Sequence, residues 1–171
     1  MMIATNIKTY AYGLADVKAY LFAFLFVIGN LLLPQICHLL PQGGMVWLPI
    51  YFFTLVAAYK YGLSVGLLTA VLSPLANHWL FGMPASGMLP IILSKSILLA
   101  VAASLVSKKT GTVSLLSLLI VILCYQFVGT MIEWVIVKDF RVAVQDFRLG
   151  IPGMLFQLFA GYGFLKLIAQ K

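Results

Sequence analysis

The sequence predicts an all-α membrane protein with six transmembrane helices, and three observations support this fold class. Of the 171 residues, 63% are hydrophobic and only 9% are charged, whereas about a quarter of the residues in a soluble domain carry charge. Six stretches are long and apolar enough to cross a bilayer, which takes roughly 20 residues for a helix. The lysines and arginines between these stretches fall mainly on one side. We therefore expect a single transmembrane domain over residues 1–171.

The first three predicted helices are bounded by turn residues. The first covers residues 16–40, and Pro34 is expected to kink it or to end its regular part. A Pro-Gln-Gly-Gly turn separates it from the second, residues 45–59, which is short for a membrane span. A Lys-Tyr-Gly turn then leads into the third helix, residues 63–81.

The last three predicted helices are separated by polar segments. A loop rich in glycine and proline precedes the fourth helix, residues 87–106, and a Ser-Lys-Lys-Thr-Gly break precedes the fifth, residues 112–137. A longer charged segment, residues 138–150, is expected to be the loop that leads to the sixth helix, residues 151–168.

The basic residues predict the orientation of the bundle. By the positive-inside bias, the side with more lysine and arginine faces the cytoplasm, so we expect a multi-pass protein of the inner (cytoplasmic) membrane with both termini inside. The net charge of +7 does not indicate nucleic-acid binding, because the basic residues are scattered near helix ends. The side of the N-terminus holds Lys8, Lys18, Lys60, Lys108, Lys109, Lys166 and Lys171, against Lys138, Arg141 and Arg148 on the other side.

Polar residues gather in the outward half of the predicted bundle. Lys95 lies about eight residues, or roughly 12 Å, below the outer end of the fourth helix, and polar residues of the third, fifth and sixth helices lie at a similar level. Polar groups at this depth persist where they line a cavity or pair with one another. We therefore predict a small-molecule pocket, open to the outside, formed by Gln42, Trp47, Asn77, His78, Lys95, Gln126, Thr130, Glu133, Trp134 and Gln157.

A purely structural role for the charged residues remains open as well. Lys95 and Glu133 could form an ion pair that only holds the fourth and fifth helices together. A metal site is not predicted, because His38 and His78 lie far apart in the sequence without Cys, Asp or Glu at ligand spacing. Enzyme motifs are missing and the chain contains four acidic residues, so neither catalytic residues nor a cofactor are expected.

Small residues recur at four-residue spacing in two of the predicted helices. One stripe consists of Gly62, Gly66 and Ala70, and the other of Ala19 and Ala23. Helices in lipid associate by close packing, which small residues permit. Internal helix packing is the simplest role for both stripes.

Several short patterns, spread over most of the chain, carry a resemblance to a known family. They are Ala19-x-x-x-Ala23, Gly43-Gly44, Tyr61-Gly62-x-x-x-Gly66, Leu72-Ser73-Pro74-Leu75-x-Asn77 and Gly82-Met83-Pro84. In combination they resemble the S component, the substrate-binding membrane subunit, of an energy-coupling factor (ECF) vitamin transporter. Ala19-x-x-x-Ala23 is similar to the AxxxA docking motif of that family.

The resemblance implies a function and partners. An S component has six helices with both termini inside, captures a vitamin-like micronutrient from outside, and hydrolyses no ATP itself. Ala19 and Ala23 would contact a transmembrane T component, which two ATPase subunits power. The chain does not match the binding patterns of thiamine, riboflavin or biotin members, so no specificity is carried over. Lys95, with Arg141 and Arg148, suggests an anionic group on the ligand.

Two other functions fit a small polytopic membrane protein. One is a structural scaffold of the rod-shape-determining MreD type, which requires no buried polar layer. The other is an ion-coupled transporter or channel that acts alone, although the sequence shows no inverted repeat of broken helices and few intramembrane acidic residues.

Overall fold

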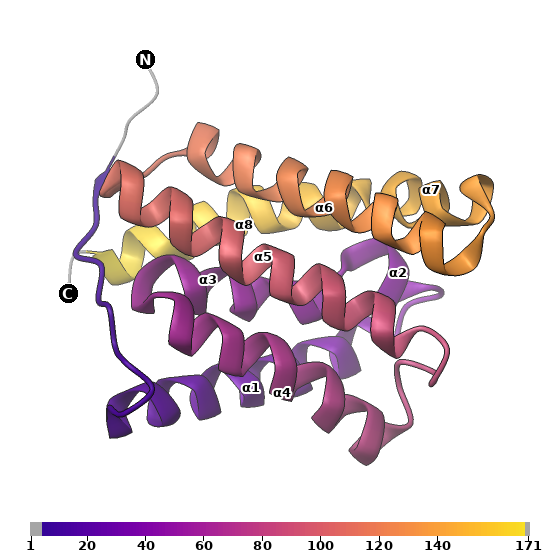
Figure 1. The fold of residues 1–171 in the computed structure, drawn as a ribbon, viewed down its shortest axis with the longest axis horizontal. Helices are drawn as coiled ribbons and strands as arrows, with labels where there is room; N and C mark the ends of the chain where they lie inside the picture. The colour runs from indigo at the N-terminus through magenta and orange to yellow at the C-terminus, as the bar shows by residue number, and fades with distance from the viewer. Residues whose placement is uncertain (1–4, 170–171) are drawn as a thin grey trace.

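Long apolar helices run back and forth along the molecule (Figure 1). The computed structural model describes residues 5–169, apart from the side chain of Asp146. Within them, five helices are long and apolar enough to cross a membrane: α1 (Val17–Cys37), α4 (Leu63–Phe81), α5 (Leu89–Thr110), α6 (Leu115–Val137) and α8 (Ile151–Ala169). The expectation of an all-α fold is thus confirmed, and five candidate spans, in place of the predicted six, indicate a multi-pass membrane protein.

The second predicted span is broken into three pieces. In place of one helix over residues 45–59 there are α2 (Gly43–Trp47), a 3₁₀ turn η1 (Pro49–Tyr51) and α3 (Phe52–Tyr61). Leu48, between the first two pieces, has a left-handed backbone with φ 47° and ψ 46°. Pro49 accounts for the break, since a proline disfavours α-helical geometry in the residue before it and has no N–H to donate. The prediction of one continuous helix here is wrong.

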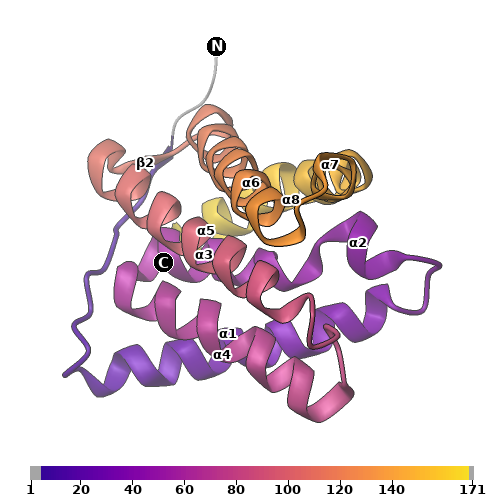
Figure 2. The same ribbon diagram turned by 45° about the vertical axis from the view of Figure 1, so that its right-hand side comes forward.

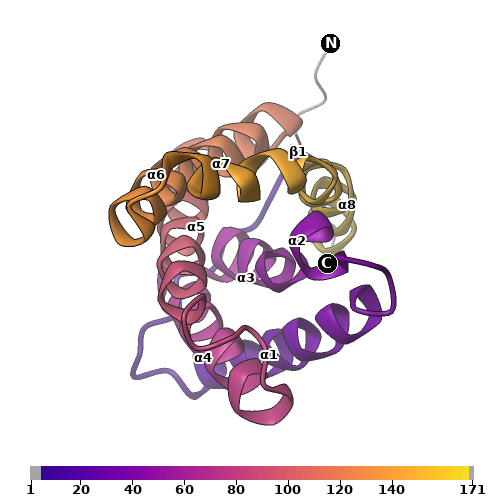
Figure 3. The ribbon, with the colours of Figure 1, turned by 90° about the vertical axis from the view of Figure 1, so that its right-hand side faces the viewer.

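Helix α3 lies inside the bundle, surrounded by the longer helices in the view along the bundle axis (Figure 3). All its residues from 54 to 60 are buried. Helix α3 packs closely against α4 at Gly66, because a Cβ added to this glycine would lie only 2.5 Å from the Ala58 Cβ. The apolar character of this segment therefore reflects burial in protein, whereas that of α1 reflects an exposed face on which Phe24 is 66% accessible.

A further helix occupies the segment predicted to be a loop. Helix α7 (Phe140–Leu149) follows α6, and its start is capped by Asp139, whose Oδ1 accepts hydrogen bonds from the backbone N–H groups of Arg141 and Val142. Apolar side chains recur along α7 at helical spacing, so one of its faces is apolar. The prediction of a loop over residues 138–150 is wrong.

One end of the molecule gathers the start of α1, the α3–α4 and α5–α6 junctions and the end of α8 (Figure 1). There β1 (Thr5–Asn6) pairs antiparallel with β2 (Thr112–Val113), and the chain then runs along this end to α1 (Figure 2). We call it the basal end. Of the basic residues expected on the cytoplasmic side, Lys171 lies outside the described residues.

Candidate functional site

A buried ion pair joins α5 and α6 in the half of the bundle opposite the basal end. The Lys95 Nζ lies 2.5 Å from the Glu133 Oε2, and the two residues are 1% and 2% exposed. Gly129, one turn before Glu133, provides space for the lysine, because a Cβ at Gly129 would lie 2.6 Å from the Lys95 Cγ. The pair has no net charge, which makes its burial possible.

The helices of the ion pair, and α8, also carry buried polar atoms without hydrogen-bond partners. Within the described part of the chain, they include the Ser96 Oγ of α5, the Gln126 Oε1 and Thr130 Oγ1 of α6, and the Gln157 Nε2 of α8. Each unsatisfied buried group costs about 1–3 kcal/mol, so a water or ligand that hydrogen-bonds to these atoms would be stabilising. We call Lys95, Ser96, Gln126, Thr130, Glu133 and Gln157 the polar layer.

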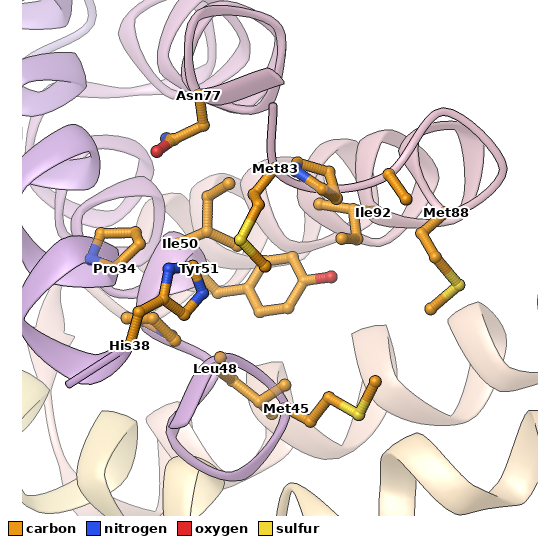
Figure 4. Close-up of a pocket in the computed structure, with 14 residues that line it drawn as sticks. Pro34, His38, Met45, Leu48, Ile50, Tyr51, Asn77, Met83, Met88 and Ile92 are labelled. Atoms are coloured by element: carbon orange, nitrogen blue, oxygen red, sulfur yellow. The ribbon is translucent and has the colours of Figure 1, made fainter. Parts of the chain in front are cut away.

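Two tyrosines connect the polar layer with an open cavity. The Tyr125 hydroxyl donates to the Gln157 Oε1 at 3.0 Å, and the Tyr125 ring lies 5.4 Å from the Tyr51 ring, centroid to centroid. Tyr51 also lines the cavity, and its hydroxyl is directed into it (Figure 4). Ile92, another lining residue, is three positions before Lys95, so the cavity lies about one helical turn beyond the polar layer.

This outer cavity has a volume of about 250 Å³. Its walls come from the end of α1, the α2–η1 segment, the α4–α5 loop and the start of α5 (Figure 4). The lining is mostly apolar and includes Met45, Met83 and Met88, whereas His38 contributes a polar ring. Flexible methionine side chains adapt to irregular apolar ligands, so the cavity suits the apolar part of a small molecule.

Asn30 organises a second polar cluster, in which hydrogen bonds join α1, α3 and α4. The Asn30 Nδ2 donates to the Thr54 Oγ1 at 3.0 Å and the Ser73 Oγ at 3.1 Å, and the Asn30 Oδ1 accepts from the Phe53 backbone N–H at 3.2 Å. The Phe52 N–H at the start of α3 donates to the Pro49 carbonyl oxygen of the 3₁₀ turn, and Asn30 supplies the acceptor for the next N–H group, that of Phe53. This cluster is structural.

Asn77, a predicted ligand residue, belongs partly to this structural cluster. Its Nδ2 donates to the backbone carbonyl oxygens of Asn30 at 2.9 Å and Ser73 at 3.0 Å. Both amide hydrogens are thereby used. Asn77 also lines the outer cavity, where only its Oδ1 remains to accept a hydrogen bond from a ligand.

The other predicted ligand residues lie apart from the polar layer. Gln42 is exposed, with a left-handed backbone, and Trp47 and Trp134 are 36% and 43% exposed. The His78 Nδ1 lies 2.7 Å from the Pro84 carbonyl oxygen, which ties α4 to the following loop. Of the ten predicted residues, the structure therefore pairs Lys95 with Glu133 and buries Gln126, Thr130 and Gln157, each with an unsatisfied polar atom.

The two alanines expected at a docking surface face the interior. Ala19 and Ala23 are 0% and 1% exposed and belong to the hydrophobic core. They pack within the bundle, as small residues at close helix contacts do and as the simplest role of this stripe predicts, and docking of a partner at Ala19 and Ala23 stays a prediction.

Sequence reasoning missed several residues of the site. Ser96 and Tyr125 directly follow or precede predicted residues, but hydroxyl groups are common in membrane helices and give no distinct pattern. Tyr51 gave a weak indication, because an aromatic residue near polar groups is typical of a small-molecule site but also of a membrane interface. The Asn30 cluster had a usable indication, since an asparagine in the middle of an apolar helix is costly unless it is paired.

The chain matches no protein-family model, no curated protein and no solved structure. Within residues 5–169, no group of three or more His, Cys, Asp and Glu side chains is placed to hold a metal ion. Interpretation of the site therefore depends on its own chemistry.

Proposed function

We propose that this protein is a membrane subunit that binds a small micronutrient from outside and delivers it inward, as the S component of an ECF-type importer does. The polar layer is the observation that carries this proposal. A scaffold requires no buried hydrogen-bonding atoms left without partners, whereas α5 and α8 each contribute one and α6 contributes two, in the bundle that holds the buried ion pair. An outer cavity one turn away supplies a path for a ligand.

The ion pair sets the charge of the proposed ligand. A simple anion that bound Lys95 would displace Glu133 and leave a buried carboxylate without a cation, which is strongly unfavourable. The ligand proposed is therefore neutral or zwitterionic, in place of the anion suggested by the sequence. It carries a donor for the Gln126 Oε1 and an acceptor for the Gln157 Nε2, with an apolar part in the outer cavity.

The proposed energy source is a T component with two ATPase subunits, and both termini are proposed to be cytoplasmic. Burial of Ala19 and Ala23 favours a second candidate, a small-solute transporter that acts alone. One measurement distinguishes the S component from the solitary transporter. Uptake by an S component depends on co-expressed T and ATPase subunits, whereas uptake by a solitary transporter does not.

Co-purification tests ligand binding directly. The full chain is purified in mild detergent, and small molecules released by denaturation are identified and quantified by mass spectrometry. We expect the wild-type protein to release one compound in stoichiometric amount. Gln126→Met or Gln157→Met should lower the amount retained about tenfold, because each substitution removes a buried hydrogen bond to the ligand. Lys109→Gln, at the exposed basal end of α5, is the control and keeps the compound. Ligand-free wild-type protein that associates only with cytoskeletal partners would support the scaffold.

A further inference from the structure

A second cavity, of about 220 Å³, lies at the basal end. Its walls are the extended segment 9–12, the α3–α4 junction and the last turns of α5. The hydroxyl-bearing residues Ser64 and Ser104 and the cation Lys108 are among its lining residues. We call it the basal cavity. The proposed function does not use it.

Positive charge is concentrated around one ring of this cavity. The Nζ atoms of Lys8 and Lys60 lie 5.5 Å and 5.9 Å from the centroid of the Tyr10 ring, and Tyr10 lines the cavity. Burial, and after it the positive charge of Lys8, lowers the pKa of Lys60, so the two ammonium groups repel each other. Lys60 is only 3% exposed and donates a hydrogen bond to the Ile168 carbonyl oxygen. Lys108 adds a third positive charge at the cavity wall.

Carboxylates of the described residues do not balance these cations. The ion pair found among those residues is Lys95 with Glu133, in the other half of the bundle. Asp16 accepts a hydrogen bond from the Gly13 backbone N–H and does not line the cavity, and Asp139 caps α7. An anion in the basal cavity would therefore relieve the repulsion between Lys8 and Lys60.

We propose that the basal cavity binds the phosphate group of an anionic phospholipid. The ammonium group of Lys108 and the hydroxyls of Ser64 and Ser104 donate to the phosphate, and the field of Lys8 and Lys60 attracts it. Basic pockets between transmembrane helices on the cytoplasmic side are suited to anionic headgroups, and the charge distribution predicts that this end is cytoplasmic. Leu63 and Leu105, which are 43% and 62% exposed, offer an apolar surface for an acyl chain.

Native mass spectrometry of the full chain in mild detergent tests this site with defined lipids. Phosphatidylglycerol and phosphatidylcholine of the same acyl composition are titrated separately, and inorganic phosphate forms a third arm. We expect preferential binding of phosphatidylglycerol, weakened about fivefold by Lys108→Gln, since a lysine near an anionic lipid contributes about 1 kcal/mol. The matched control is Lys109→Gln, which removes the same charge from the next residue, outside the cavity wall.

Three results would overturn the proposal: equal binding of the two lipids, equal losses in Lys108→Gln and Lys109→Gln, or saturation of the site by inorganic phosphate that blocks the lipid. Both lysines are exposed, so the variants are expected to fold. Their thermal transitions without added lipid check this. Neither variant touches the polar layer, so this test stands or fails independently of the proposed transport function.

Discussion

Removal of one member of the Lys95–Glu133 pair should destabilise the protein far more than removal of both. The Nζ and Oε2 atoms are 2.5 Å apart, where unit charges attract by about 7 kcal/mol at an effective dielectric constant of about 20. This attraction offsets a desolvation penalty of several kcal/mol per ion. Lys95→Met or Glu133→Leu removes this attraction but leaves the remaining charged side chain with its own desolvation penalty. Each variant should therefore lower the free energy of unfolding by about 3–5 kcal/mol.

The double variant Lys95→Met/Glu133→Leu removes both charges together with their desolvation penalties. Apolar replacements of similar size for a buried pair are often neutral or stabilising, so its stability should lie near that of the wild type. The interaction energy from this double-mutant cycle measures the coupling between the two side chains. Because the two side chains are in contact, their effects should not add, and the cycle should show coupling of about 3 kcal/mol or more.

Thermal unfolding in one detergent, followed by tryptophan fluorescence at a fixed scan rate, provides the assay. For a chain of this size, about 1 kcal/mol corresponds to 2–4 °C, so each single variant should melt roughly 6–20 °C below the wild type. Lys109→Gln, on the exposed end of α5, controls for the loss of a lysine charge. Single variants that melt within about 2 °C of the wild type would refute the reasoning, as would a double variant as unstable as either single one.

Three further perturbations test the packing around the site, each measured by the same thermal assay. Asn30→Leu removes the side-chain partner of three hydrogen-bonding groups and should cost about 2–4 kcal/mol; an unchanged melting temperature would show that the cluster is dispensable. Gly129→Ala should cost about 1–3 kcal/mol because its Cβ would lie 2.6 Å from the Lys95 Cγ, whereas Gly163→Ala, with open space around it, should be neutral. Ala23→Trp should unfold the bundle or displace α1, since Ala23 is 1% exposed; a normally stable variant would mean that this position is accessible after all.

Hydropathy and charge were sufficient to predict the membrane class and five spans, because those helices are long and face lipid on one side. Pairing of Lys95 with Glu133 was one of the two alternatives open from the sequence, since isolated charges at that depth are so unfavourable. The burial of Ala19 and Ala23 agrees with internal packing, the simplest role predicted for them, although the same spacing serves internal packing and docking alike. Which it serves depends on the rotation of α1, and that rotation is set by tertiary contacts.

The amphipathic helix α7 had a visible pattern that the loop prediction overlooked. Phe140, Ala143, Val144 and Phe147 recur at i, i+3, i+4 and i+7, the spacing of an apolar helix face. Charged residues between them lower the mean hydropathy, so a search for membrane spans passes over the segment. Helical periodicity, taken separately from hydropathy, identifies it.

The broken second span and the outer cavity have one physical origin. Helix α3 has ten residues and rises about 15 Å, roughly half the thickness of the hydrocarbon core. A continuous helix would have filled the outer half of the bundle with its own side chains. Because Pro49 ends the helix there, α2 and η1 fold aside and line the outer cavity instead, while Asn30 accepts a hydrogen bond from the Phe53 N–H at the start of α3. Restoring helix geometry with Pro49→Ala and Leu48→Ala should therefore shrink the cavity and weaken retention of any co-purifying ligand, with the polar layer itself unchanged. Full retention of the ligand in that double variant would show that the cavity is not part of the binding site.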